Sequence, residues 1–422
     1  MASHNNAIHP GTVPRHPRVD SPNTPSSRFG GPNRRPRPSR PLTLPGSESQ
    51  SRFAQSPSRF AQSPSRFAQS PSRFARLWLV LLAVLSLAIR PADLQAQSAK
   101  GKSFESRGQD FVTAETQKGI DRGLAFLAKT QSTDGSYPGS NYRRNVAVTS
   151  LSGMAFLAAG HVPGRGGYGK NVDLAVDSIL SSATPTGFIK RDDSPEHGPM
   201  YGHGFATLFL AEVYGMSPKP EIHRALKAAT QLIVNSQNRE GGWRYKPESR
   251  DADVSVTVCQ MMALRGARNC GIAVPKTTVD NCVEYVRKCQ NGDGGFRYQL
   301  SGRPTSDFPR SAAGIVILYN AGVADGRDLE RGLGFLLRTP PRGTLMNSDP
   351  HYFYGQYYAV QAMWHAGDDY WQQWYPAIRD ELLIRQTPDG YWADQSVNNA
   401  YGTAMACLIL QMPNNLLPIF QR

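Results

Sequence analysis

Two acidic residues in the segment Asp251-Ala252-Asp253-Val254 carry the chemistry that stands out in this sequence. A carboxylic acid in an apolar cavity, beside a second carboxylate, has a raised pKa and can stay protonated near neutral pH. Such a group can act as a general acid, so Asp253 and Asp251 are candidate catalytic residues. The alternative is structural, because Asp253 can cap a helix by accepting from the backbone N–H groups of its first turn. We expect Asp253 to matter more, since the apolar run of the following helix starts at Val254.

A second group of candidates consists of tyrosine and histidine residues at the start of apolar segments. Tyrosine offers an aromatic face and a hydroxyl group, and histidine can exchange a proton near neutral pH. The sequence contains no His pair at positions i and i+4 and no Glu-x-x-His motif, so it predicts no metal and no cofactor. We expect one shared cavity in which a ligand is bound by Tyr201, His203, His351, Tyr354 and Tyr401.

One glycine-rich segment matches a nucleotide-binding motif by its sequence alone. GRGGYG, at Gly164–Gly169, matches the G-x-G-x-x-G pattern of dinucleotide-binding turns. That pattern binds a dinucleotide only where it follows a strand and begins a helix. Here it follows the apolar run AFLAAG, which is typical of a helix. We therefore interpret it as a flexible connection between two helical hairpins.

An internal repeat indicates which elements must position these candidates. Four segments share the pattern Q-x-x-x-G-x-aromatic, and two further places keep the glycine but lack the glutamine. The six glycines are Gly135, Gly187, Gly241, Gly294, Gly343 and Gly390. They lie 47–54 residues apart, so six units account for nearly all of residues 109–422. A regular period of this length is typical of repeat architectures.

Each unit has the pattern of a helix, a glycine turn and a second helix. Before the turn at Gln290, one stripe of an amphipathic helix is formed by Val279, Cys282, Val283, Val286 and Cys289. After the turns come segments such as RSAAGIVILYNAG, which are apolar all round and therefore typical of buried helices. No useful length of alternating strand pattern occurs. Each unit thus pairs an amphipathic outer helix with a buried inner helix.

Six such hairpins can stack as an open solenoid or close into a ring. An open solenoid usually ends in polar capping repeats. In this sequence the last unit, which runs through Ile419 and Phe420, is as apolar as the middle ones. We therefore predict an all-α protein whose residues 109–422 form an (α/α)6 toroid of six helical hairpins, with the inner helices around a central cavity.

The repeated turns resemble those of the prenyltransferase and squalene-cyclase repeat superfamily, whose members form terpenoid cyclase-like toroids. The resemblance covers about 314 residues, and four of the six units carry the full motif. It implies that the Gln and the aromatic residue tie successive outer helices together. Trp243, Phe296 and Trp392 are then expected between adjacent outer helices at one end of the ring.

The same resemblance bears on the two acids. Squalene cyclases place a D-x-D-D motif at the start of an inner helix, where the middle Asp protonates an alkene or epoxide. Carried over to this sequence, that general acid is Asp253, with Asp251 as the first acid of the motif. Val254 occupies the position of the last Asp. The resemblance thus implies a class II terpene-cyclase-like isomerase with an incomplete acidic motif, and whether the protein is an enzyme stays open.

A zinc site like that of the protein prenyltransferases is not expected. In that branch of the superfamily, an Asp-x-Cys pair and a distant His hold the metal. Asp280-Asn281-Cys282 and His351 match the residue types. However, Asp280 and Cys282 precede the turn at Gln290, which places them on an outer helix instead of an inner one. We interpret Cys282 as a buried core thiol.

The basic charge of the protein belongs to its N-terminal tail. The chain carries a formal net charge of +14. Residues 1–76 contain twelve Arg, no Lys and two acids, for a net +10, and the remaining residues carry only +4. No nucleic acid partner is therefore expected for the folded part. The tail repeats the heptapeptide SRFAQSP and is predicted to be disordered, either as a spacer, as sequence upstream of the true start, or as a basic tether.

Residues 77–97 have the pattern of a sorting signal. An apolar run of 13 residues, LWLVLLAVLSLAI, follows Arg73 and Arg76 and precedes small residues. This order is typical of a secretory signal peptide, and an uncleaved membrane anchor is the alternative. We expect an exported protein, periplasmic or extracellular, or a membrane-anchored one. Residues 98–108 then form a linker, and residues 109–422 form the toroid.

Two classes of function follow from this organisation. The first is a toroid whose cavity binds an apolar or isoprenoid-like ligand. Whether such a toroid also performs cyclase chemistry at Asp253 is left open by the sequence. The second is a non-catalytic toroid that binds a protein or a cell-envelope polymer. A carbohydrate-active toroid is a further alternative, but glycosidases need two carboxyl groups roughly 5–9.5 Å apart, and the sequence identifies no such pair. A deep apolar cavity that reaches Asp253 would favour the first class.

Overall fold

The computed structural model describes residues 104, 108–139, 142–194, 197–341 and 351–422. The predictions for the tail, for residues 77–97 and for most of the linker lie outside the described residues. Within them the chain has twelve α-helices, three short 3-10 helices and no β-strand, which confirms the all-α prediction. No helix in the described part of the chain combines the length and apolar character that crossing a membrane requires.

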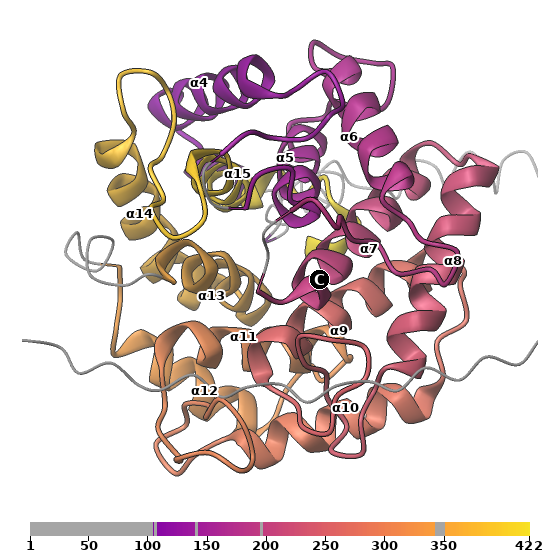
Figure 1. The fold of residues 1–422 in the computed structure, drawn as a ribbon. Coiled ribbons are helices and arrows are strands. Elements are labelled where there is room, and N and C mark those ends of the chain that lie inside the picture. The colour runs from indigo at the N-terminus through magenta and orange to yellow at the C-terminus, as the bar shows by residue number, and fades with distance from the viewer. Residues whose placement is uncertain (1–103, 105–107, 140–141, 195–196, 342–350) are drawn as a thin grey trace, which may run out of the picture. The chain divides into compact units, whose positions relative to one another are not determined.

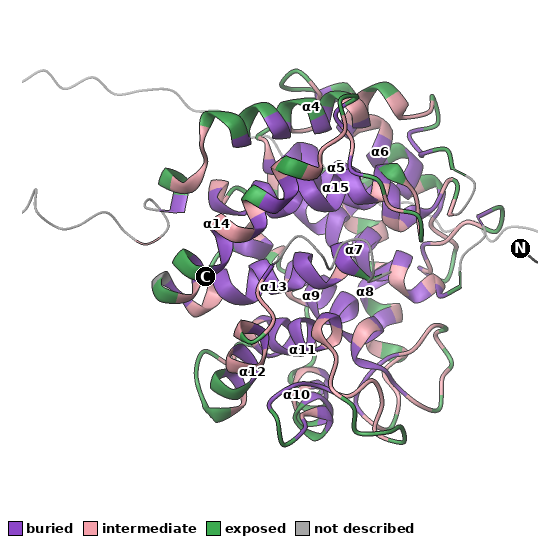
Figure 2. Cartoon of the chain, turned by 90° about the vertical axis from the view of Figure 1, so that its left-hand side faces the viewer, coloured by how far each residue is buried: buried purple, intermediate pink, exposed green. Residues whose placement is uncertain are grey.

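The twelve helices alternate between an outer and an inner layer (Figure 1). The outer helices are α4 (Ala114–Thr130), α6 (Gly169–Ser181), α8 (Pro220–Asn235), α10 (Lys276–Cys289), α12 (Arg327–Leu337) and α14 (Asp368–Arg385). The inner helices are α5 (Val146–Ala158), α7 (Pro199–Met216), α9 (Val254–Asn269), α11 (Phe308–Asn320), α13 (Tyr352–Ala366) and α15 (Asn399–Leu410). Figure 2 shows the inner helices almost wholly buried, while the outer helices expose one face, as their amphipathic pattern predicts.

The inner helices form a closed ring. Each contacts the next one along the chain, and α15 contacts both α5 and α4, so the last hairpin packs on the first. The structure therefore confirms the toroid and excludes an open solenoid. Because α7 and α13 are opposite members of this six-helix ring, a contact between them crosses its centre.

The motif glutamines join the units. In Gln237, Nε2 donates to Gly241 O in its own turn and to Thr278 O at the start of α10, both at 2.8 Å. Gln131 and Gln290 make the corresponding pairs of hydrogen bonds to their own turns and to α6 and α12. In the last unit, Nε2 of Gln386 donates to Gly390 O and to Gly119 O of α4, each at 2.8 Å. The same side chain that spaces the repeats thus also closes the ring.

The motif glycines allow this close approach. Gly241 has φ of +97°, and a Cβ atom placed there would lie 2.3 Å from Asn281 O of the next outer helix. The aromatic position is also interlocked. Trp392 donates from Nε1 to Leu382 O of α14 at 2.8 Å, and its ring lies against Gly123 of α4. As the resemblance implies, this tryptophan lies between adjacent outer helices.

The ring-closing glutamine gives the first prediction. We expect Gln386→Ala to lower the free energy of unfolding by about 1–3 kcal/mol, because two carbonyl oxygens lose their donor in a partly buried turn. Gln373 lies on the exposed face of α14, the helix that Gln386 follows. Gln373→Ala removes a hydrogen bond within one turn and is expected to change stability by less than about 0.5 kcal/mol. Urea unfolding followed by circular dichroism measures both. Equal losses in the two variants would contradict the proposed role of Gln386 in closing the ring.

The centre of the ring is filled partway along the inner helices. Phe205 of α7 contacts Tyr357 of α13 with ring centroids 6.3 Å apart, and Tyr357 contacts Phe420 of the 3-10 helix η4 (Pro418–Phe420) at the same separation. Arg265 of α9 donates from Nη2 to Gln421 O at 2.9 Å. The C-terminal segment therefore packs against this contact, and a cavity lies on the side where the inner helices begin.

Candidate functional site

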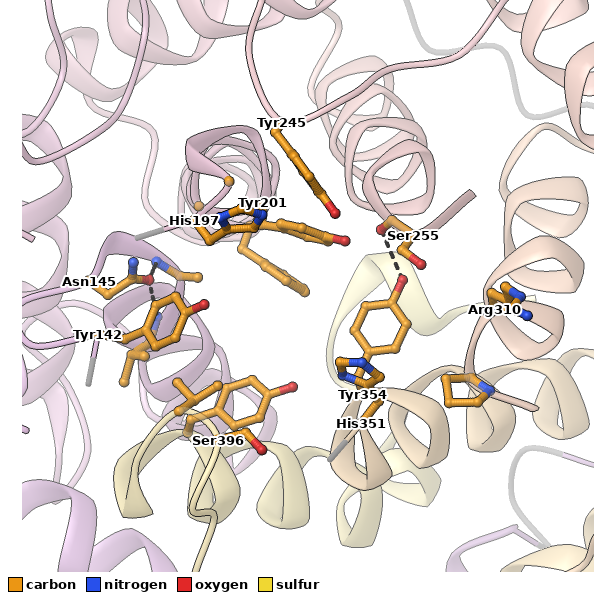
Figure 3. A pocket seen from close by; sticks show the side chains of 18 of the residues that line it. Tyr142, Asn145, His197, Tyr201, Tyr245, Ser255, Arg310, His351, Tyr354 and Ser396 are labelled. Carbon is orange, nitrogen blue, oxygen red and sulfur yellow. Dashed lines mark hydrogen bonds between the residues drawn. The ribbon is translucent and has the colours of Figure 1, made fainter. Parts of the chain in front are cut away.

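A cavity of about 480 Å³ lies where the inner helices begin, and we call it the bowl (Figure 3). All six glycine-turn and inner-helix junctions contribute to it, because each inner helix starts at the same end of the ring. Its described lining residues are Tyr142, Asn145, Ala147, Val148, His197, Gly198, Tyr201, Gly202, Phe205, Tyr245, Ser255, Tyr298, Asp307, Pro309, Arg310, His351, Tyr354, Ser396, Val397 and Tyr401.

Aromatic side chains form most of the wall of the bowl. Six tyrosines and one phenylalanine supply rings from all around the ring of helices. Asp307 is the only acid among the described lining residues, and its Oδ2 accepts from Nη1 of Arg310 at 3.2 Å. The other guanidinium nitrogens of Arg310 donate to Phe296 O and Thr305 O at 3.1 and 3.0 Å. The bowl is therefore a largely aromatic surface whose one arginine is already bonded within its own turn.

Four of the five predicted ligand-binding residues come together here. Tyr201, His351, Tyr354 and Tyr401 all line the bowl, and Figure 3 shows the first three facing the same space. The hydroxyl group of Tyr354 donates to Ser255 O at 2.9 Å, which fixes the direction of that ring. Contact of these residues with a ligand stays a prediction.

His203 lies elsewhere. It is fully buried and does not line the bowl. Nδ1 accepts from the backbone N–H of Ile189 at 3.1 Å, and Nε2 lies 3.3 Å from Ala229 O of α8. Burial lowers the pKa of this imidazole to about 4, so it is neutral and Nε2 carries the proton that Ala229 O accepts. These contacts join the turn before α7 to α8, which is a structural role.

Asp253 is the N-cap of α9. Its Oδ1 accepts from the backbone N–H of Val256 at 2.7 Å, as the capping interpretation predicts. The side chain is fully buried and does not line the bowl. Its Oδ2 lies 3.4 Å from both Nε of Arg244 and the hydroxyl group of Tyr298. Burial raises the pKa of Asp253 to about 6. The Val256 N–H and the Arg244 charge oppose this shift, because both stabilise the ionised carboxylate.

Asp251 points to a different environment from Asp253. Its side chain is half-exposed, and Oδ2 accepts from Nη1 of Arg244 at 3.1 Å and from Nε2 of Gln299 at 2.8 Å. Asp251 does not line the bowl either. Arg244 thus contacts both acids, although one carboxyl group is fully buried and the other is half-exposed.

Two residues of the bowl were absent from the predicted site although the sequence carries a signal for them. Tyr245 and Tyr298 follow the motif aromatic by two positions, in the related segments GGWRY and GGFRY. Both line the bowl, and their hydroxyl groups are hydrogen-bonded to each other. Extending the repeat by two residues would have found this pair. Asp253, the N-cap of α9, is therefore a neighbour of this tyrosine pair.

The described residues contain no group of three or more His, Cys, Asp or Glu side chains that could hold a metal ion. Asp280 and Cys282 lie on the outer helix α10, as predicted, with Cys282 buried in the core. Burial raises the pKa of the Cys282 thiol, so it carries a proton at neutral pH.

Replacement of Asp253 separates capping from charge. We expect Asp253→Asn to be at least as stable as the parent protein, because Asn caps a helix as well as Asp does and carries no charge that burial disfavours. We expect Asp253→Ala to be about 1–2 kcal/mol less stable than Asp253→Asn, since Val256 N–H loses its buried acceptor. Urea unfolding at neutral pH measures both variants. Equal stability of the two variants would contradict the cap.

Comparisons with known proteins agree with this architecture. No family model matches the chain. A drimenyl diphosphate synthase from Streptomyces showdoensis is 24% identical over 185 residues, which are 44% of this chain and about a third (32%) of that protein. The type II terpene cyclase MstE from Scytonema superposes with a TM-score of 0.52 at 17% identity, over 72% of this chain and 99% of the cyclase.

An alpha-1,6-mannanase of Salegentibacter superposes equally well. Its TM-score is 0.53 at 7% identity, over 71% of this chain and 99% of the mannanase. At such identities these likenesses concern the fold, and a toroid hosts more than one chemistry. Together with the closed ring of six hairpins and the motif glutamines, they show that the chain folds as a terpenoid cyclase-like α/α toroid.

Proposed function

We propose that the bowl binds an amphipathic small molecule with an apolar, isoprenoid-like body. The observation that supports this proposal is the lining, in which six tyrosine rings and the ring of Phe205 surround a cavity of about 480 Å³. Cavities of this size and composition are typical of small-molecule sites. The contact between Phe205 and Tyr357 closes the bowl from below, so a ligand would enter from the end where the inner helices begin.

The comparisons support an isoprenoid class of ligand. MstE is described in complex with geranylgeranyl dihydroxybenzoate as its substrate, at a TM-score of 0.52 to this chain. The curated relative is named for drimenyl diphosphate. Aromatic walls suit such molecules, because they bury apolar surface and allow ring and alkyl contacts.

Binding is supported better than direct proton donation by Asp253. The carboxyl group of Asp253 is fully buried and lies behind the hydroxyl group of Tyr298, which lines the bowl. A ligand in the bowl therefore meets Tyr298 before it meets the acid. The function we propose is ligand binding, with no catalytic step assigned to Asp251 or Asp253.

Binding of a cell-envelope polymer is the second candidate. The mannanase was described with bound alpha-1,6-mannotriose, and tyrosine rings suit stacking on sugars. Hydrolysis would need two carboxyl groups roughly 5–9.5 Å apart. Asp307, the single acid in the described lining, is paired with Arg310, so this candidate is a binding function as well.

Recovery of a bound molecule tests the proposal. The protein is purified without detergent and extracted with organic solvent, and the extract is analysed by mass spectrometry. We expect an isoprenoid-class lipid from the parent protein and from Ala125→Trp, which alters the exposed face of α4. We expect its loss from Ala147→Trp, which places an indole in the bowl. Equal recovery from both variants, or recovery of an oligosaccharide, would overturn the isoprenoid proposal.

We also propose that residues 77–97 direct the toroid out of the cytoplasm, as a cleaved signal or as an anchor. A reporter that is active only outside the cytoplasm, fused after residue 110, should be active when residues 1–110 precede it. The same fusion that starts at residue 98 serves as the control and should be inactive. Activity of both fusions, or of neither, would contradict the sorting role.

A further inference from the structure

A chain of three hydrogen-bonding groups runs from the interior to the bowl. The hydroxyl group of Tyr298 donates to Oδ2 of Asp253 at 3.4 Å, and it is bonded in turn to the hydroxyl group of Tyr245. Tyr245 and Tyr298 line the bowl, whereas Asp253 is fully buried. Figure 3 shows the Tyr245 hydroxyl directed into the space near Tyr201 and Ser255. The protonation state of a buried acid is thus connected to the surface that a ligand meets.

Arg244 holds this chain in place. Its guanidinium carbon lies 4.7 Å from the ring centroid of Tyr245 and 5.5 Å from that of Tyr298. The same group contacts both Asp251 and Asp253. Stacking of a guanidinium on two aromatic rings restricts both of them, so the hydroxyl groups keep their positions.

Asp253 is the group in this cluster that changes charge near neutral pH. Titratable and charged groups surround Asp253 from its own turn, from α7, α9, α10 and α13, and from the turn before α11. They are Arg244, Asp251, Glu240, Tyr201, Cys259, Tyr285, Cys289, Tyr354 and Tyr298. Burial raises the pKa of each of these thiols and of these four phenols well above neutrality. The Arg244 guanidinium stays charged throughout.

The direction of the hydrogen bonds depends on the proton of Asp253. A hydroxyl group donates one hydrogen and accepts through its lone pairs. When Asp253 is ionised, Tyr298 donates to it and Tyr245 donates to Tyr298, so Tyr245 turns only lone pairs toward the bowl. When Asp253 is protonated, it can donate to Tyr298, which then donates to Tyr245. The hydrogen of Tyr245 is thereby released toward the bowl.

We propose that the Tyr245–Tyr298 pair is the polar recognition point of the bowl, and that its preference is set by the proton of Asp253. With the proton present, the pair selects a ligand with an acceptor oxygen, such as a ketone or an aldehyde. Without it, the pair selects a ligand with a donor, such as an alcohol. The ligand class is therefore a small apolar molecule with one oxygen function, and this inference rests on the proposed binding function of the bowl.

Two probes of equal shape test this directly. 2-Acetylnaphthalene carries a carbonyl oxygen that can only accept, and 2-isopropenylnaphthalene replaces that oxygen with a methylene group. Binding of each is measured by isothermal titration calorimetry at about pH 5 and about pH 8, on either side of the pKa of about 6. We expect the ketone to bind about three- to tenfold more tightly than the alkene at the lower pH, and the difference to vanish at the higher pH.

Three variants sharpen the test. Tyr245→Phe should bind both probes equally at both pH values, because the terminal hydroxyl group is gone. Asp253→Asn should prefer the ketone at both pH values, since its amide always donates to Tyr298. Tyr391→Phe, in the outer turn before α15, should behave like the parent protein. Circular dichroism confirms that each variant is folded.

The outcomes separate this inference from the function on which it rests. If both probes bind the parent protein with one ratio at both pH values, the bowl binds small molecules but the switch is wrong. If the preference for the ketone survives in Tyr245→Phe, another group recognises the oxygen and the inference is overturned. If neither probe binds the parent protein, the binding function itself fails, and the switch fails with it.

Discussion

Gly241→Ala is expected to lower the free energy of unfolding by about 3 kcal/mol or more. Gly241 has φ of +97°, and an added Cβ would lie 2.3 Å from Asn281 O and 2.9 Å from its carbonyl carbon. Both atoms belong to the backbone of α10, so they cannot move aside as a flexible side chain could. A left-handed residue and a forced shift of packed backbone each cost about 1–3 kcal/mol. Urea unfolding followed by circular dichroism measures the loss.

Gly271 supplies a matched control. It also has a left-handed backbone, with φ of +78°, but a Cβ there would meet no atom within 4 Å. Gly271→Ala therefore isolates the conformational cost, which we expect to be about 1 kcal/mol. If both variants lose the same free energy of unfolding, the contact with Asn281 does not contribute to the loss. The close approach of successive outer helices is then not what requires the glycine.

Glu212→Gln is expected to stabilise the protein by about 3–5 kcal/mol at alkaline pH and by little at acid pH. Glu212 of α7 is 2% exposed, and its Oε2 has no hydrogen-bond partner among the described residues. Burial raises the pKa of this carboxyl group to about 8, although the backbone N–H of Ile419 and the charge of Arg265 oppose the shift. Glutamine keeps an acceptor for Ile419 and has no proton to lose.

The sign follows from proton binding in the two states. Between the ordinary value of 4.5 and about 8, the unfolded chain has lost the Glu212 proton while the folded protein retains it. The folded state binds more protons, so the stability of the parent protein falls as pH rises, by about 1.4 kcal/mol per pH unit at most from this group. Above about pH 8 both states are ionised, and the difference from Glu212→Gln becomes constant.

Urea unfolding at about pH 5, 7 and 9 measures the difference between the parent protein and Glu212→Gln. Glu284→Gln is the control, because Glu284 lies on the exposed face of α10 beside Lys288. The difference in stability between the parent protein and Glu284→Gln should stay the same between pH 7 and pH 9. A constant difference between parent and Glu212→Gln over the whole range would contradict the raised pKa of Glu212.

The architecture could be predicted from the sequence because the interactions that build it repeat. Each of Gln131, Gln237, Gln290 and Gln386 bonds its own turn and the start of the next outer helix, so its spacing in the sequence reports the spacing of the hairpins. The contrast between amphipathic and wholly apolar segments reports which helix of each pair is buried. Periodicity of this kind depends on local spacing, so it can be recognised before the fold is known.

The candidate site could be predicted only in part. The sequence places Tyr201, His351, Tyr354 and Tyr401 at the starts of inner helices, and the structure puts all four in the bowl. His203 has the same sequence context, but it is directed toward Ile189 and Ala229 and away from the bowl. A residue near the start of a buried helix can face the axis of the ring or the neighbouring hairpin, and the type of residue does not distinguish these directions.

By itself, the sequence determined the six units and the two layers of helices, and it placed Asp253 just before an inner helix, because these depend on local spacing. Only the tertiary structure decided how far the cavity extends and what lines it. Tyr357 and Phe205 meet across the ring and fill its centre, and Tyr298 lies between Asp253 and the bowl. Residues that are distant in sequence share these positions, and burial and charge there depend on all of them at once.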